Sequence, residues 1–339
     1  MSLSSDAIVK QEIIDSLGTS YRNVQLRIFR QSSNQDQLPF SKGGLTFGYA
    51  HVYYGSCDAA WFIDAKWTDG YDGTAINEKP LIALEGTDAL NRGSSGNAQT
   101  QRFHHVLGAV KDGIIGVYYL RKGSDKIRPD LFGMAYFASK VEKGKYLIID
   151  DLVVVKNILN AYDSPAKCLK YINDYMEYMY SIFQEYFQRM YEGSWQNFAD
   201  ARSTIIKKDY VIKYAARSRR NFTDSSQRAG HIAVGEMYLT RYYFYGKKFY
   251  YLFPRMSDED LEYLDEHKSD DKEWRILRHE PDVEIKTVDD IIGLTPSMKD
   301  ALMTIKDEPI IGGPARSIYN KCVDKIVDGL KSGTLQIKH

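Results

Sequence analysis

Two acidic residues in the first third of the chain, Asp64 and Glu85, each end an apolar run that is typical of a β-strand. If the two strands are neighbours in one sheet, we expect both carboxylates to emerge at the same edge, close enough to share a cation. Carboxylate and water oxygens are the ligands that Mg²⁺ prefers in proteins. A bound Mg²⁺ would hold a phosphate oxygen and lower the pKa of an attacking water. The pair therefore predicts a metal site suited to phosphate chemistry.

Three further polar residues near this pair could hold a phosphate or a water molecule. Lys66 lies two positions after Asp64, so the two-residue period of a strand puts both side chains on one face. Gln101 and Arg102 lie in a predicted helix that follows the second acid. Arg102 could clamp a phosphate through two parallel hydrogen bonds, and a surface ion pair is the other interpretation.

The loop 93–96 (GSSG) lacks the lysine of a P-loop, but the helix start after it exposes N–H groups that can bind an anion. His104 and His105 follow in that helix. Their adjacent positions do not favour a histidine metal pair, because such a pair needs both side chains on one helix face.

A second polar cluster, residues 207–231, is rich in positive charge. It holds seven basic residues against two acidic ones, a net charge of +5 in a chain whose formal net charge is +0. Phosphate contacts with DNA need such local charge, and a solvated surface is the other interpretation. The basic residues that we predict to contact DNA are Lys207, Lys208, Lys213, Arg217, Arg219, Arg220 and Arg228.

Apolar patterns indicate the elements that position these groups. Helical periods cover residues 4–17 and 97–112, and each is followed by a glycine that can end a helix. Strand patterns cover residues 23–30, 45–54, 59–67, 81–84 and 114–120. A hairpin is expected across residues 55–58. These elements predict an α/β (α+β) fold in which helices cover the faces of a mixed sheet.

The order helix–strand–strand–strand–helix–strand, with an acid–x20–acid spacing, resembles the core of the PD-(D/E)xK nuclease superfamily, which includes many type II restriction endonucleases. The resemblance covers about residues 4–122. Asp64, preceded by Ile63 in place of proline, matches the aspartate of the PD motif. Glu85 matches the acid of (D/E)xK, while Thr87 stands where that motif has lysine.

Two questions stay open in this resemblance. The candidates to replace the motif lysine are Lys66, Gln99, Gln101 and Arg102. An alternative register takes Asp64, Ala65 and Lys66 as the DxK motif, with Asp58 or Asp36 as the earlier acid. The first register is preferred, because only it leaves a helix directly after the second acid.

The resemblance implies a hydrolase, a metal-dependent endonuclease that cuts double-stranded DNA with Mg²⁺ as its cofactor. Asp64 and Glu85 would be the metal ligands, and Lys66, Gln101 and Arg102 the partners of phosphate or water. One rival is a carboxylate-pair hydrolase such as a glycosidase, with Glu85 as acid or base. The other is a non-catalytic module that binds nucleic acid or protein through residues 207–231. Metal dependence would separate the nuclease from both rivals.

The rest of the chain favours helices. We predict a nuclease-like core in residues 1–125 and a mainly helical region for DNA contact and association in residues 126–339. Helical periods cover residues 151–159, 165–191, 195–202 and 231–244, and a strand pattern covers 248–253. An aromatic stripe from Tyr171 to Phe187 fits either the protein core or a subunit interface. A homodimer is expected, because two-fold symmetry suits the cutting of both strands.

Composition sets the outer bounds. At 339 residues the chain is long enough for two domains, and its 45 basic and 45 acidic residues balance. Three widely spaced cysteines support neither a disulfide framework nor a zinc cluster. The N-terminus lacks the apolar segment of a signal peptide, and no apolar run approaches the roughly 20 residues that a membrane helix needs. We therefore expect a cytoplasmic protein without a membrane segment.

Overall fold

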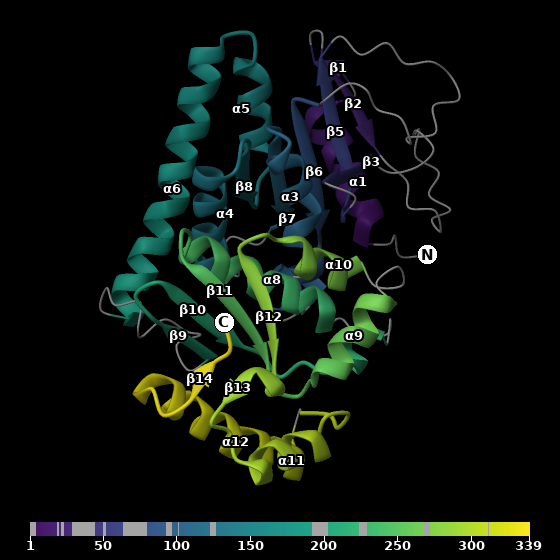
Figure 1. The fold of residues 1–339 in the computed structure, drawn as a ribbon. Helices are drawn as coiled ribbons and strands as arrows, with labels where there is room; N and C mark the ends of the chain where they lie inside the picture. The colour runs from purple at the N-terminus through teal and green to yellow at the C-terminus, as the bar shows by residue number, and fades with distance from the viewer. Residues whose placement is uncertain are drawn as a thin grey trace. The chain divides into compact units, whose positions relative to one another are not determined.

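The structure, a computed structural model, describes residues 5–18, 20–21, 24–28, 45–49, 52–63, 80–92, 97–100, 102–122, 127–191, 203–223, 229–267, 272–310 and 312–339. The chain forms two compact units, Met1–Tyr186 and Phe187–His339, each with its own main sheet (Figure 1). The mixed α/β fold class is thereby confirmed. None of the described helices is long and apolar enough to cross a membrane.

The first unit is built on a six-stranded sheet. The strands of the unit are β1 (Ser20–Tyr21), β2 (Val24–Ile28), β3 (Leu45–Tyr49), β4 (Val52–Cys57), β5 (Ala59–Ile63), β6 (Ile82–Thr87), β7 (Ile115–Leu120) and β8 (Lys145–Ile149). The order in the main sheet is β1-β2-β5-β6-β7-β8. From β1 to β6 neighbouring strands are antiparallel, whereas β6, β7 and β8 are parallel. β3 and β4 form a separate antiparallel pair.

The helices of this unit are α1 (Ser5–Leu17), α2 (Asn97–Thr100), α3 (Phe103–Lys111), α4 (Pro129–Val141), α5 (Val153–Ala161) and α6 (Pro165–Tyr191). Three of them, α1, α5 and α6, begin and end close to the sequence-based predictions, and α4 is not predicted. The predicted helix 4–17 is confirmed by α1, and the helix 165–191 by α6. Gly18 ends α1 with a φ of 68° and donates its N–H to the O of Ile14 at 2.7 Å, a left-handed C-terminal cap.

Helices approach both faces of the sheet closely. A Cβ on Gly86 of β6 would lie 2.4 Å from Val9 Cγ1 in α1. A Cβ on Gly116 of β7 would lie 2.4 Å from Val106 Cγ1 in α3. The register pairs Gly86 with Tyr119, three positions from Gly116, and this odd spacing puts the two glycines on opposite faces. α1 and α3 therefore cover opposite faces, each resting on a glycine.

The first unit also corrects three expectations. The predicted hairpin across residues 55–58 is wrong, because β4 pairs with β3 while β5 lies between β2 and β6. The predicted helix 97–112 is divided into α2 and α3, with Arg102 in a turn before α3. The compact unit extends beyond residue 125, because β8 is the last strand of the same sheet.

The long helix α6 covers the open edge of this sheet at β8. The Tyr175 hydroxyl donates to the O of Ile148 at 2.8 Å, and the Ile148 N–H lies 3.4 Å from Met179 Sδ. Met179 and Phe183 are buried, whereas Tyr178 is 54% exposed. The described part of the aromatic stripe thus packs largely within its own unit, and its side chains cap backbone groups of an edge strand.

The second unit has a four-stranded mixed sheet. Its main strands are β9 (Thr204–Ile206), β10 (Tyr210–Tyr214), β11 (Lys248–Phe253) and β12 (Val283–Thr287), in the order β12-β11-β10-β9. A small sheet pairs β13 (Ile291–Ile292) with β14 (Gln336–Ile337). The helices are α7 (Arg220–Thr223), α8 (Ala229–Tyr243), α9 (Asp258–Glu266), α10 (Lys272–His279), α11 (Pro296–Thr304) and α12 (Gly313–Ser332).

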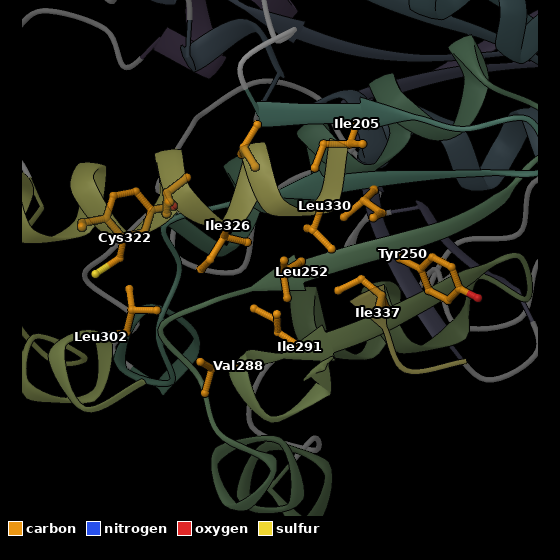
Figure 2. Close-up of a cluster of buried hydrophobic side chains, with 14 of the residues drawn as sticks. Ile205, Tyr250, Leu252, Val288, Ile291, Leu302, Cys322, Ile326, Leu330 and Ile337 are labelled. Carbon is orange, nitrogen blue, oxygen red and sulfur yellow. The ribbon is translucent and has the colours of Figure 1, made fainter. Parts of the chain in front are cut away.

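An apolar core joins this second sheet to α12 (Figure 2). Tyr250 and Leu252 of β11 contribute to the core from the sheet, and Ile326 and Leu330 contribute from α12. The helical C-terminal region is confirmed by α11 and α12, and the strand predicted at 248–253 is confirmed by β11. The sequence does not predict β10 and β12, the parallel neighbours of β11.

Candidate functional site

Glu85 lies in β6 with a buried side chain, 3% exposed. Its Oε1 lies 2.8 Å from Arg102 Nη1 and 3.3 Å from His105 Nδ1. Arg102 lies in the turn before α3 and His105 in the first turn of α3, so the start of one helix supplies both partners. A buried carboxylate needs such partners, because an unpaired charge away from water is costly. The glutamate singled out by the sequence is therefore held in a defined position.

A second buried acid, Asp58, lies beside Glu85 at the start of β5. Its N–H donates to the O of Leu84 at 2.8 Å, and its Oδ2 accepts from the N–H of Gly86 at 2.9 Å. Asp58 is thus bonded to the residues on both sides of Glu85. Its Oδ1 lies 3.5 Å from the Nζ of Lys10, a lysine of α1 that is only 1% exposed. Two acids from neighbouring strands therefore share this part of the first unit.

Strand direction explains why Asp58 is the neighbour of Glu85. Ala59 pairs with Leu84 and Trp61 pairs with Ile82, so β5 and β6 are antiparallel. The start of β5 lies beside the second half of β6, and the end of β5 lies beside the start of β6. The prediction that both strands end at the same edge of the sheet is therefore wrong. The predicted pairing of residue 64 with Glu85 depends on that shared edge.

Several predicted site residues fall where the structure gives no description. Asp64, Lys66 and Gln101 lie outside the described residues. Of the residues predicted for the metal and phosphate site, Glu85 and Arg102 are described, and the structure brings them into contact. Lys10 is the addition that sequence reasoning misses, because nothing local distinguishes it from the other charged residues of its helix.

The carboxylates act together on the thiol of Cys57, which precedes Asp58 in the chain. Burial raises the pKa of this thiol well above its ordinary value, and the negative charges of Glu85 and Asp58 raise it further. Tyr118 pairs with Glu85 in the β6–β7 register. Burial raises the pKa of the Tyr118 hydroxyl most, Arg102 lowers it and Glu85 raises it. The two carboxylates therefore act on groups that are shielded from water.

The positions considered for the motif lysine make other contacts. Thr87 Oγ1 accepts the N–H of Ala89 at 3.2 Å. Gln99 is buried, and its Oε1 accepts the N–H of Arg128 at 2.9 Å. A different lysine, Lys10, reaches one of the two acids, because its ammonium lies 3.5 Å from Asp58 Oδ1. It comes from the first helix rather than from the strand of the motif.

The basic segment 207–231 is divided by a strand. Lys207 and Lys208 precede β10, and Arg217, Arg219 and Arg220 follow it. A five-residue strand is about 16 Å long, so these two groups of cations lie well apart. Within the described residues, the two groups of cations therefore lie at opposite ends of β10.

Several cations of this segment have structural contacts of their own. Lys213 in β10 is buried, and its Nζ donates to Ser203 Oγ. Arg219 Nη1 lies 3.4 Å from Asp260 Oδ1, and its guanidinium lies 4.7 Å from the centre of the Tyr263 ring. Arg228 lies outside the described residues. Lys207 Nζ donates to the O of Lys331 at 3.1 Å, and Arg217 Nη2 lies 3.4 Å from Glu236 Oε2.

No protein-family model, curated protein or solved structure matches this chain. Function therefore rests on the site itself, because a fold by itself does not determine an activity. The site combines two buried carboxylates, a buried lysine and a partly exposed arginine at the start of a helix. These groups are suited to binding a hard cation together with a phosphate.

Proposed function

We propose that this chain is a Mg²⁺-dependent endonuclease that hydrolyses phosphodiester bonds of double-stranded DNA. The observation that carries the proposal is the pair Asp58 and Glu85, two buried acids on neighbouring antiparallel strands. Apart from the two-residue β1, the separate pair β3–β4 and the short helices before α3, the elements follow the order α1, β2, β5, β6, α3, β7. This order supports the proposal, because it is the helix–strand–strand–strand–helix–strand order of the nucleases that the sequence resembles. In this proposal Asp58 takes the role that the sequence assigns to Asp64.

Mg²⁺ fits the donor set of this site, because Asp58 and Glu85 supply carboxylate oxygens from adjacent strands. When bound, the ion would polarise the phosphate and lower the pKa of an attacking water. To bind the ion, Asp58 would give up part of its contact with Lys10, and Glu85 part of its contact with Arg102. Arg102 is able to make this exchange, because about a third of its side chain is exposed, 32%.

The cations of the chain would then position the substrate. The guanidinium of Arg102 would donate to a phosphate oxygen, and the buried ammonium of Lys10 would keep Asp58 in place. Hydrolysis forms a P–O bond from the water oxygen and breaks one ester P–O bond, whose oxygen leaves as a hydroxyl. His105 Nδ1, 3.3 Å from Glu85 Oε1, is an imidazole nitrogen placed to accept or supply the proton in this exchange.

Incubation of the purified chain with DNA of mixed sequence, such as a whole bacterial genome together with plasmids, tests the proposal. We expect discrete fragments in Mg²⁺ and intact DNA when EDTA replaces the metal, because the acids alone cannot activate water. Uncut DNA in Mg²⁺ over this range of sequences, or equal cutting in EDTA, would contradict the proposal.

The same experiment separates the two rivals. A non-catalytic binding module would retard DNA in a gel and leave it intact in Mg²⁺. A glycosidase would leave DNA uncut in any metal. The contacts of Glu85 also disfavour that second activity, because its Oε1 already accepts from the guanidinium of Arg102 and lies beside the imidazole of His105.

We also propose that the chain acts as a homodimer, because two copies related by two-fold symmetry can cut both strands of a symmetric sequence. The expected result of sedimentation equilibrium at micromolar concentration is a mass near twice 38.9 kDa. A monomer that still cuts both strands in one encounter would exclude this arrangement.

A further inference from the structure

The second unit contains a cavity of about 450 Å³ at the end of β10 that the proposed nuclease site does not use. Cavities of about 300–1,000 Å³ are the usual size for small-molecule ligands. Its walls include three arginines, Arg217, Arg220 and Arg255, together with Ser218 and Asn221. Two of these arginines belong to the basic segment, and the third comes from the turn after β11.

Arg255 gives the cavity a rigid, charged wall. It is 3% exposed, and it donates to the backbone O of Ala216 at 3.1 Å and of Ile305 at 2.7 Å. It also donates to the O of Lys306 at 2.6 Å. These bonds tie the chain after β10 to the chain after α11, so the guanidinium is held before any ligand arrives. Burial lowers the pKa of Arg255, yet arginine remains charged in proteins.

Arg217 supplies a second guanidinium, which can donate further hydrogen bonds. Its Nη2 lies 3.4 Å from both carboxylate oxygens of Glu236, a long contact for an ion pair. Glu236 also accepts from the Tyr251 hydroxyl at 3.2 Å. The Nε atoms of Arg217 and Arg255 are buried and have no hydrogen-bond partner among the described residues. Buried donors of this kind are normally satisfied, so an acceptor bound in the cavity would complete them after a small adjustment.

Exposed residues complete the lining of the cavity. Arg220 and the acids Asp307 and Glu308 are exposed, and they line the cavity together with Pro309. The cavity therefore combines guanidinium groups with carboxylates and an apolar ring. A ligand that matches these groups has an anionic group and a ring with amine donors.

We propose that this cavity binds the phosphate of a nucleotide, with Arg217 and Arg255 on the phosphate side and the base toward Asp307 and Glu308. Guanidinium groups suit phosphate oxygens, and carboxylates accept from exocyclic amines such as that of cytosine. The nucleotide could be free or one unit of a DNA strand, and both sources present the same phosphate chemistry. Only the second source rests on the proposed nuclease function.

Titration calorimetry on the full chain in EDTA tests the proposal without using the metal site. The probes are deoxycytidine monophosphate, deoxycytidine, and a short DNA duplex. The variants are Arg217→Gln and, as a control, Arg278→Gln, an arginine of α10 in the same unit that pairs with Asp265. Thermal melting of each variant shows whether the fold is kept, and Arg217→Lys retains the charge if the glutamine variant is unstable.

We expect the monophosphate to bind at least about 10-fold more tightly than deoxycytidine, because only the former offers a charge-assisted bond. Arg217→Gln should remove this preference, whereas Arg278→Gln should keep it. A loss in Arg217→Gln that affects the duplex but not the monophosphate would identify the DNA strand as the source. Equal binding of the monophosphate and deoxycytidine, or no difference between the two variants for any probe, would overturn the proposal. A chain that binds the monophosphate but cuts no DNA would support the nucleotide site and contradict the proposed nuclease function.

Discussion

Glu85→Gln is expected to reduce Mg²⁺-dependent DNA cleavage by about 1,000-fold or more, because a metal ion contributes several kcal/mol to stabilising the transition state. Glutamine has the same shape as glutamate, and its Oε1 can still accept from Arg102 and His105. It lacks the negative charge that a divalent cation requires. The variant should therefore keep its fold and its affinity for DNA while losing cleavage, measured as initial rates on a defined fragment.

Glu142→Gln is the matched control for this experiment. Glu142 is also a partly buried carboxylate of the first unit, with Oε1 3.3 Å from the Nζ of Lys111. Its substitution removes a charge from an ion pair without touching the acids of the proposed site. The two variants should melt at similar temperatures and differ strongly in cleavage. Comparable cleavage by both would show that Glu85 serves only to hold Arg102 and His105.

The second large effect distinguishes Asp58 from Asp64 as the acid that binds the metal together with Glu85. Asp58→Asn should lower the cleavage rate by about 100-fold or more, a loss of roughly 3 kcal/mol in transition-state stabilisation. Asp64→Asn should change it by less than about 5-fold. The reason is the antiparallel register of β5 and β6, which places the first residue before β5, and not the end of β5, beside Glu85.

Asparagine is the right replacement at Asp58, because its Oδ1 can still accept the Gly86 N–H that the aspartate holds at 2.9 Å. The substitution does leave the buried ammonium of Lys10 without its carboxylate, so stability must be measured beside activity. The double variant Lys10→Met with Asp58→Asn removes both charges and should regain stability but not cleavage. An inactive Asp64→Asn beside an active Asp58→Asn would restore the original motif register and remove the pair on which the proposal stands.

Elements with strong local patterns are predictable from this sequence. The aromatic and apolar period of residues 165–191 predicts α6 with the same ends that the structure shows, and the run 248–253 predicts β11. Gly113, with a φ of 87°, closes α3 as the sequence predicts, because glycine adopts this conformation without steric cost. Each of these depends on contacts between residues a few positions apart, which a sequence displays directly.

Pairing between distant segments is what only the tertiary structure decides. Alternation of apolar and polar residues is the same whether a strand runs parallel or antiparallel to its neighbour, so the sequence alone does not distinguish Asp58 from Asp64 as the neighbour of Glu85. Lys10 and Asp58 meet because α1 packs on β6 over a glycine. Arg255 reaches the carbonyl of Ile305, 50 positions away, in the same manner. Such contacts depend on how faces pack, and a buried charge finds its partner through that packing rather than through spacing along the chain.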